Sequence, residues 1–397
     1  MKKGNIFAGL LISLILFHCI AAGAIAQRIS QGQPVQTAAT PELRIVTLTP
    51  AATPAPAPTL EMPAASVQKS GKVRVNGWIQ KTADAGFSPR ASHLSLVFQD
   101  KIWVIGGGNP AVKGGGDVWN SADGTIWKEV ISDCNTFGGY LLSGFIFQDK
   151  MWVISRNGYD HQLMVWNSND GVKWTQIFNS ADFYKNLAGC VLFKDRIWLI
   201  KSFEDKSKNS VFSSADGVKW KLEVPAASFN LRDSTALVVH NDCLWMIGGM
   251  AFADGISYLD DVWSSRNGID WQLVTQHGGF GKRALHSALE YQGKIWITGG
   301  ECEKTCLNDI WFSKDGANWG HPRKNAGFSP RFSQSSVVFK DRIWIIGGSD
   351  EDNHTFNDVW CSAPMGIRKF FGSFIVLIFV AISIGIMLNI KRSAGNQ

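Results

Sequence analysis

A short motif recurs six times along the chain, and this repetition constrains the fold more than any other feature. Each copy is a run of branched apolar residues around one tryptophan, and four of the copies end in a glycine pair. In chain order the six tryptophans are Trp103, Trp152, Trp198, Trp245, Trp296 and Trp344. They follow one another at intervals of 46 to 51 residues. Because a unit of this length cannot bury its own core, the six units must pack against one another in a repeated architecture.

The residues of one unit predict four antiparallel strands. In the first unit, 93–98 is a β-prone run, and 101–105 is a second strand that ends at the glycine pair. A variable loop leads to a third strand at 118–121. Asp123-Gly124 then favours a hairpin, since this turn needs positive φ, and a short fourth strand follows. Six such units predict a six-bladed β-propeller, and the lack of a 3.6-residue periodicity excludes a helical solenoid.

The sixth unit ends after Cys361 without a fourth strand, and the N-terminal part of the chain offers the missing one. Trp78 is followed by the segment 85–90, whose sequence AGFSPR is identical to that of 326–331 after Trp319 in the fifth unit. We therefore expect residues near Trp78 to form the outer strand of blade six and close the ring, which removes a loose sheet edge. With this residue counted, all 17 tryptophans fall on repeat positions, so we expect them to fill space within and between blades.

These motifs resemble the Kelch-repeat family, including the related propeller of galactose oxidase, over residues 71–366. The resemblance implies an all-β, six-bladed Kelch-type β-propeller closed by an N-terminal strand. The Ser-x-Asp-Gly-x-x-Trp hairpins also resemble shortened Asp-boxes of sialidases, which are turn elements remote from chemistry. Blades two and three depart from the Kelch pattern. Ser155 and Lys201 stand near their glycine positions, and the Asp before the third-strand aromatic is missing.

The two ends of the chain predict a single-pass membrane protein with the propeller on the extracytoplasmic side, either periplasmic or at the cell surface. The predicted segments are a signal peptide at 1–26, a Pro/Ala/Thr-rich disordered linker at 27–70, the propeller at 71–366, a transmembrane helix with flanking charges at 367–390 and a cytoplasmic tail at 391–397. The span rests on Phe370–Ile390, 21 almost entirely apolar residues. Cys19 would be the acylated residue of a lipoprotein, but Phe17 and His18 stand where small residues are needed.

Cysteine usage does not predict a disulfide-built domain. Cys302 and Cys306 are close in sequence, so a disulfide staple of their loop is one alternative, whereas the scattered cysteines are expected to be small buried residues. Glu301, Glu303 and Asp309 lie beside this pair, but they mix hard oxygen with soft sulfur ligands. A disulfide or a solvated loop is therefore favoured over a metal site, and no cofactor is predicted.

Known catalytic motifs are absent from the sequence. It contains no phosphate-binding loop, no His-Glu-x-x-His and no Gly-x-Ser-x-Gly elbow. Galactose-oxidase or sialidase chemistry is not supported, because none of the five tyrosines has a recognisable ligand or nucleophile context. The net charge of +6 is mild and spread out, which gives no case for a nucleic-acid partner. Binding is therefore expected rather than catalysis.

Positively charged side chains supply the candidate ligand site. Arginines recur just before the inner strand of four blades, and histidines follow two of them by three residues: Arg90, His93, Arg232, Arg283, His286 and Arg331. A four-stranded meander places these positions on the face that carries the variable second-to-third-strand loops, at 108–116, 155–163, 201–209, 250–260, 301–308 and 349–357. We call it the loop face. Arg156 and Lys201 would add charge there.

Two roles for the arginines stay open at this point. One is an anion-binding mouth for a sugar acid or an acidic peptide, and the other is structural bonding to neighbouring backbone. The favoured function is a binding or scaffold module that recognises a protein or a glycan through one propeller face. The alternatives are a carbohydrate-active enzyme of the sugar-acid or sialic-acid mutarotase type at the channel mouth, by analogy of fold, and a structural envelope-assembly protein.

Overall fold

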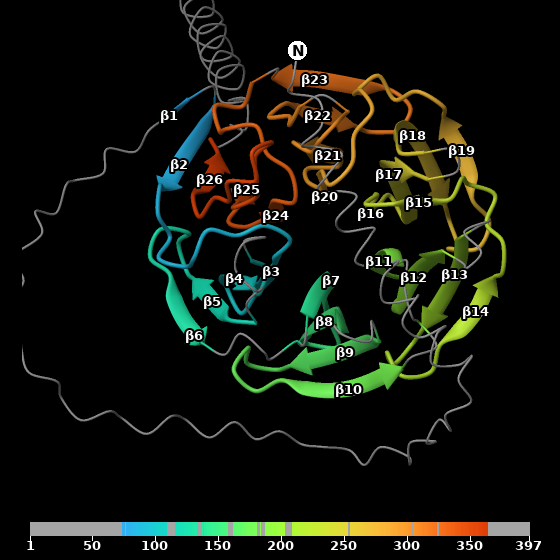
Figure 1. Cartoon of the computed structure of the whole chain (residues 1–397), viewed down its shortest axis with the longest axis horizontal. Coiled ribbons are helices and arrows are strands. Elements are labelled where there is room, and N and C mark those ends of the chain that lie inside the picture. The colour runs from blue at the N-terminus through green and yellow to red at the C-terminus, as the bar shows by residue number, and fades with distance from the viewer. Residues whose placement is uncertain are drawn as a thin grey trace, which may run out of the picture. The chain divides into compact units, whose positions relative to one another are not determined.

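Antiparallel strands arranged as six sheets around a central axis make up the propeller (Figure 1). The structure is a computed structural model. It describes residues 74–75, 77–108, 116–132, 137, 139–157, 162–180, 183, 187–202, 209–252, 255–303, 305–323 and 325–363. The predicted signal peptide, linker, transmembrane helix and tail lie outside this part of the chain. Within the described ranges, no helix has the length and hydrophobicity needed to cross a membrane.

The first three blades are four-stranded meanders, with the inner strand named first. Blade one comprises β3 (Leu94–Phe98), β4 (Lys101–Ile105), β5 (Val118–Ser121) and β6 (Lys128–Ile131). Blade two comprises β7 (Gly139–Phe147), β8 (Lys150–Asn157), β9 (Leu163–Ser168) and β10 (Thr175–Ser180). Blade three comprises β11 (Leu187–Phe193), β12 (Arg196–Ser202), β13 (Asn209–Ser214) and β14 (Lys221–Val224).

The other three blades follow the same plan, and blades four and six each have one additional short strand. Blade four comprises β15 (Arg232–Asp233), β16 (Ala236–His240), β17 (Cys243–Ala251), β18 (Ser257–Ser265) and β19 (Gln272–Thr275). Blade five comprises β20 (Ser287–Glu290), β21 (Ile295–Thr298), β22 (Ile310–Ser313) and β23 (Trp319–Arg323). Blade six comprises β24 (Ser335–Val338), β25 (Ile343–Ile346) and β26 (Val359–Ser362), with β2 (Trp78–Thr82) and β1 (Arg74–Val75) outside them.

The predicted ring closure is confirmed. β2 pairs with β26 in the register Ile79↔Cys361 and so supplies the fourth strand of blade six. The Trp78 ring is buried and meets Phe328 edge-on, with ring centroids 5.3 Å apart. The closing strand is therefore held by backbone bonds to the last strand and by aromatic packing against the blade five to blade six connection.

Tryptophan and glycine pack together between neighbouring blades. The Trp152 ring in blade two lies under the turn glycine Gly217 in the third-to-fourth-strand hairpin of blade three, where an added Cβ would come within 2.7 Å of the ring. The same ring-under-glycine contact recurs between other neighbouring blades, as Trp103–Gly171, Trp198–Gly268, Trp245–Gly316 and Trp344–Gly124. The repeated tryptophans are thus structural, as predicted. The repeated motif carries the contact that joins one blade to the next.

A second set of contacts joins the turns at the end of the propeller opposite the loop face. The Lys340 ammonium, in the first turn of blade six, donates 2.9 Å to the Ala122 carbonyl in the hairpin of blade one. Gln99 reaches Asn169 in the same way, and Lys194 reaches Arg266. We call the surface formed by these turns and by the hairpins at 121–127, 168–174, 214–220, 265–271 and 313–319 the hairpin face.

Candidate functional site

The guanidinium group of Arg90 is buried inside its own blade. Nη1 and Nη2 donate to the two carboxylate oxygens of Asp117 at 2.8 and 2.7 Å, and Nη1 also donates 2.8 Å to the Gly106 carbonyl. Nε donates to the Ser88 carbonyl and Nη2 to the Ser88 hydroxyl. The five N–H groups of the side chain all have acceptors, and only 1 % of the residue is exposed.

The same arrangement, which we call the arginine lock, is present in four blades. Each lock joins an arginine, the first glycine of the pair and the Asp before the third-strand tryptophan: Arg90–Gly106–Asp117, Arg232–Gly248–Asp261, Arg283–Gly299–Asp309 and Arg331–Gly347–Asp358. The four arginines are at most 1 % exposed. Each Asp also accepts from the indole N–H of the tryptophan two residues later. One carboxylate thus organises the end of the second strand and the start of the third.

These four arginines do not form the predicted anion-binding mouth. Their donors face Asp and backbone oxygens in the blade interior, so a ligand on the loop face meets no guanidinium from them. The structural alternative describes them instead. Burial alone would raise the pKa of Asp309, but the hydrogen bonds and charge of Arg283 lower it, which keeps the carboxylate ionised and the pair intact.

The sequence contains a pattern that indicates the lock, although the search for known motifs did not identify it. Arginine, glycine pair and Asp occur together in blades one, four, five and six and are missing together from blades two and three. Met164 replaces the Asp in blade two, and there the indole N–H of Trp166 has no hydrogen-bond partner among the described residues. Such joint presence and absence indicates one physical unit.

The two candidate histidines are also buried. His93 Nε2 lies 2.7 Å from the Ser335 hydroxyl, so it bridges blades one and six at the ring closure. Burial, and next the charge of Arg90, lower the pKa of His93 to about 3. Burial and the charge of Arg283 lower the pKa of His286 to the same value. Both rings are therefore neutral near pH 7, and a general base working at that pH would need a pKa much closer to it.

Blades two and three present charge where the locks are missing. Glycines at positive φ follow the end of the second strand in blades one, five and six, as Gly347 and Gly348 do at 55° and 105°, whereas β17 of blade four runs through its glycine pair to Ala251. In blades two and three, which have no glycine pair, the second strands also continue, β8 to Asn157 and β12 to Ser202. Arg156 and Lys201 are consequently carried on extended strands toward the loop face, and both are half-buried.

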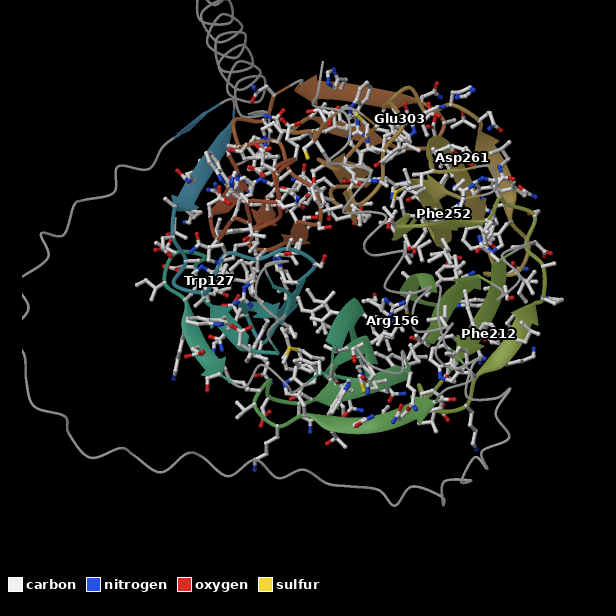
Figure 2. All side chains as sticks on the ribbon, in the orientation of Figure 1. Trp127, Arg156, Phe212, Phe252, Asp261 and Glu303 are labelled. Atoms are coloured by element: carbon white, nitrogen blue, oxygen red, sulfur yellow. The ribbon has the colours of Figure 1, made fainter. Side chains whose placement is uncertain are left out.

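Figure 2 shows Arg156 on the inner side of the ring, whereas Trp127 and Phe212 lie nearer its outer part. Asp233 of blade four is within electrostatic reach of this arginine. Burial raises the pKa of Asp233, and the N–H of Ser234 and the charge of Arg156 counteract part of that rise. The charge of a blade-two arginine thus favours the ionised form of a blade-four carboxyl group.

The loops of blades four to six carry acidic groups. The Tyr258 hydroxyl donates 3.0 Å to Glu301 Oε1 between blades four and five. Burial raises the pKa of Glu301, which the tyrosine hydrogen bond partly counteracts, while burial and Glu301 itself raise the pKa of Tyr258. The Thr305 hydroxyl donates 3.1 Å to Glu351 of blade six. The described loop face is thus basic over blades two and three and acidic over blades five and six.

The alternative of a Cys302–Cys306 staple is not realised in the structure, where both residues are free thiols. Glu301 pairs with Cys306, and the N–H of Cys302 donates 3.0 Å to Thr305. In this register the two cysteines project to opposite sides of a small hairpin, because neighbours along a strand alternate. Asp309 is held in its lock with Arg283, so the acidic and thiol groups considered for a metal are not gathered at one point.

Comparisons with known proteins agree with this fold. The KLHDC2/KLHL20/DRC7 Kelch-repeats domain matches residues 190–365. A solved structure described as "Structure of YjhT" aligns with 70 % of this chain and 96 % of its own, at 13 % identity and a TM-score of 0.54. A search of curated proteins found no match. The predicted Kelch-type propeller is thereby confirmed, and at this identity the structural likeness shows the fold alone.

Proposed function

We propose that this protein is a membrane-anchored, extracytoplasmic binding module that recognises a protein or a glycan through the loop face of the propeller. The observation that carries the proposal is the loss of the arginine lock in blades two and three. Four blades use their arginine for stability, whereas blades two and three have no lock and carry Arg156 and Lys201 on β8 and β12 toward the loop face. A rigid scaffold with charged, variable loops is a common design for binding surfaces.

Charge separation among the described residues of the loop face narrows the ligand class. Arg156 and Lys201 suit a carboxylate of a sugar acid or an acidic peptide, since charged donors bind such groups strongly. Glu301 and Glu351 on the other side suit hydroxyl or cationic groups. A ligand with both kinds of group, such as a peptide segment or an acidic glycan, matches the face better than a simple anion.

A thermal-shift screen of the full chain tests this proposal. Neutral sugars, sugar acids and acidic peptides would be added to the wild type and to Arg156→Ala, Lys201→Ala and Arg283→Ala. A ligand at 100 times its Kd stabilises by roughly 2.7 kcal/mol, which gives a shift of a few degrees. We expect the shift to vanish in the first two variants while they remain folded. Arg283→Ala should lower Tm and still bind, and loss of binding in that variant alone would contradict the proposal.

One observation favours the enzymatic alternative. Glu301 is a carboxyl group whose pKa burial raises, 3.0 Å from the Tyr258 hydroxyl, and perturbed pairs of this kind cluster at functional sites. A carbohydrate-active enzyme would use the pair as a proton donor or acceptor toward a sugar acid. Measuring the mutarotation of sialic acid with wild type and Glu301→Gln separates the two functions, because a binding module leaves the uncatalysed rate unchanged in both.

A further inference from the structure

Four hairpins of the hairpin face carry an exposed aliphatic side chain within two residues of the turn glycine. Ile126 is 77 % exposed, Val172 48 %, Val218 42 % and Ile269 39 %, and they belong to the adjacent blades one to four. Single exposed aliphatic residues are normal on protein surfaces. Their recurrence at the tips of four neighbouring hairpins places all four on one face of the propeller.

The turns do not need these aliphatic side chains. In blade two, the Ser168 hydroxyl accepts 2.9 Å from the Gly171 N–H, and Asp170 Oδ1 accepts from the N–H groups of Val172 and Lys173, each at 2.8 Å. The Trp103 ring lies beneath Gly171, and the indole N–H of Trp174 donates 3.1 Å to the Gly171 carbonyl. The backbone of Val172 serves the turn, but its side chain projects into solvent, so a polar residue there would fold equally well.

Lysines stand beside two of the four aliphatic tips. Exposed Lys173 and Lys219 directly follow Val172 and Val218, whereas exposed Asp270 follows Ile269. At the seam between blades six and one, a cavity of about 230 Å³ is lined by Ile79, Lys81, Asp123, Lys340, Arg342 and Trp344. We call it the seam pocket. Three of its six lining residues are basic, and its single carboxylate, Asp123, accepts from two N–H groups of its own hairpin.

In blade three, the residues at the equivalent positions include a carboxylate that neutralises the charge. There Glu223 lies 3.8 Å from Arg196 and accepts 2.8 Å from Lys221. In blade six, Arg342 occupies the position of Arg196, and Lys81 occupies the position of Glu223. The second equivalence follows from the register of the fourth strands. Lys81 lies two residues after Ile79, which pairs with Cys361, and Glu223 lies two residues after Lys221, which pairs with Ser213. Glu223 thus neutralises the blade-three site. At the seam, three cations face Asp123 and Asp100, the latter 3.8 Å from Lys340, which leaves a net positive charge for an external anion.

The course of the chain after its last strand indicates which surface the hairpin face contacts. Third strands end at the hairpin face, so the chain leaves the propeller there after β26. Seven residues, 363–369, separate Ser362 from the apolar stretch Phe370–Ile390. Fully extended, seven residues reach about 25 Å at most. If the stretch spans a membrane, as proposed above, the hairpin face is held within that distance of the lipid surface.

We infer that the hairpin face docks on an anionic lipid bilayer. Ile126, Val172, Val218 and Ile269 enter the headgroup region, the flanking lysines contact lipid phosphates, and the seam pocket binds one phosphate headgroup. Apolar burial and attraction to anionic lipid together are the forces that hold proteins at a membrane surface. The loop face then points away from the membrane toward its ligand. This inference rests on the proposed membrane anchoring.

Amine-reactive footprinting of the full chain tests the docking. The chain is placed in detergent, in phosphatidylcholine vesicles and in vesicles that also contain phosphatidylglycerol, and the acetylation rate of each lysine is measured by mass spectrometry. We expect Lys173 and Lys219 to react roughly fivefold more slowly in the anionic vesicles, as attraction of about one kcal/mol per basic residue implies. Lys282, an exposed residue of the connection that leads into Arg283 on the loop face, should react equally in the three settings.

Matched variants separate the contribution of the aliphatic tips from that of the seam pocket. Val172→Asp with Val218→Asp should abolish the protection of Lys219, while Ile256→Asp, an equally exposed aliphatic of the blade-four loop, should leave it intact. Lys81→Glu copies the blade-three arrangement and should remove the preference for phosphatidylglycerol. Vesicle-associated chain that labels equally on both faces would overturn the docking and leave the anchoring standing. Chain that never associates with vesicles would overturn both, and equal protection in detergent would show self-association instead.

Discussion

The carbonyl oxygen of Arg90 in blade one accepts a 2.9 Å hydrogen bond from the N–H of Gly348 in blade six. Arg283 and Arg331 receive the same bond from Gly249 and Gly300. Each of these arginines therefore bonds with its backbone to the preceding blade and with its side chain to its own. The bond needs glycine, because Gly348 has φ +105° and an added Cβ would lie 2.9 Å from the Gln334 side chain.

Breaking an arginine lock should destabilise the propeller severely. Arg232→Ala leaves the buried Asp261 carboxylate without its partner, and loss of one member of a buried pair typically costs about 3–5 kcal/mol. Urea unfolding of the variant measures this loss. Arg266→Ala, in an exposed hairpin position, should change the stability by less than about 0.5 kcal/mol. Similar unfolding midpoints for both variants would contradict the lock.

Acid should weaken the fold through the buried histidines. The pKa of His286 is about 3 in the folded state, against 6.5 for the unfolded residue. The unfolded chain therefore binds the proton first, so the stability is complete above pH 6.5 and falls as the pH drops toward 3, by about 1.4 kcal/mol per pH unit for each histidine.

His286→Gln isolates this effect, because blade six carries Gln334 at the equivalent position. The difference in unfolding free energy between pH 7.5 and pH 5 should be smaller in the variant than in the wild type. Contributions from Asp233 and Glu301, whose raised pKa values act in the opposite direction, cancel in the comparison. An unchanged difference would mean that His286 binds its proton equally in the folded and unfolded states, so that its pKa is not lowered by folding.

Turn glycines beneath which a tryptophan lies should tolerate no side chain. Gly217→Ala meets both a positive φ of 73° and the Trp152 ring, which an added Cβ would approach to 2.7 Å. Gly293→Ala meets a similar φ of 68° with open space around it. The first variant should lose roughly 2–3 kcal/mol more than the second, since only the first adds overpacking to strain. Thermal unfolding of both variants makes the comparison, and equal losses would show that strain alone matters.

Removing the closing tryptophan should open the ring. Trp78→Ala deletes a buried ring that packs on Phe328, and such deletions cost about 3–5 kcal/mol. Because β2 is also the strand that joins the two ends of the described chain, amide exchange should accelerate in β26 more than in β13, the equivalent strand of blade three. Uniform acceleration across both strands would indicate general destabilisation rather than opening at the seam.

The two loop cysteines should differ in reactivity. Burial and next the charge of Glu301 raise the pKa of the Cys306 thiol to about 12, so its thiolate is scarce at pH 8. Cys302 is half-buried and should be alkylated first by iodoacetamide in the native protein. Peptide mass spectrometry identifies the modified residue. A native peptide with the two cysteines linked would restore the disulfide alternative.

Much of the fold could be predicted from the sequence, because a propeller is built from a repeated unit. The tryptophans, the Asp-Gly hairpins and the duplicated AGFSPR segment predicted six blades and their closure, since each blade is specified by local turns and by the same neighbour contacts. The sequence placed the arginines near the loop face, but it could not predict in which direction their side chains point. Their partners lie 16 to 29 residues away in the chain, so only the folded blade decides whether a guanidinium faces solvent or a buried carboxylate.

By itself, then, the amino-acid sequence determined the all-β class, the number of blades and the strand that closes them, because these follow from periodic apolar residues and turn chemistry. The tertiary structure alone decided what the charged groups do. It buried the four arginines with Asp, separated Cys302 from Cys306 across a hairpin and left Arg156 and Lys201 on extended strands. Ionic and thiol chemistry depends on distance and burial, and both are set when strands from distant parts of the chain come together.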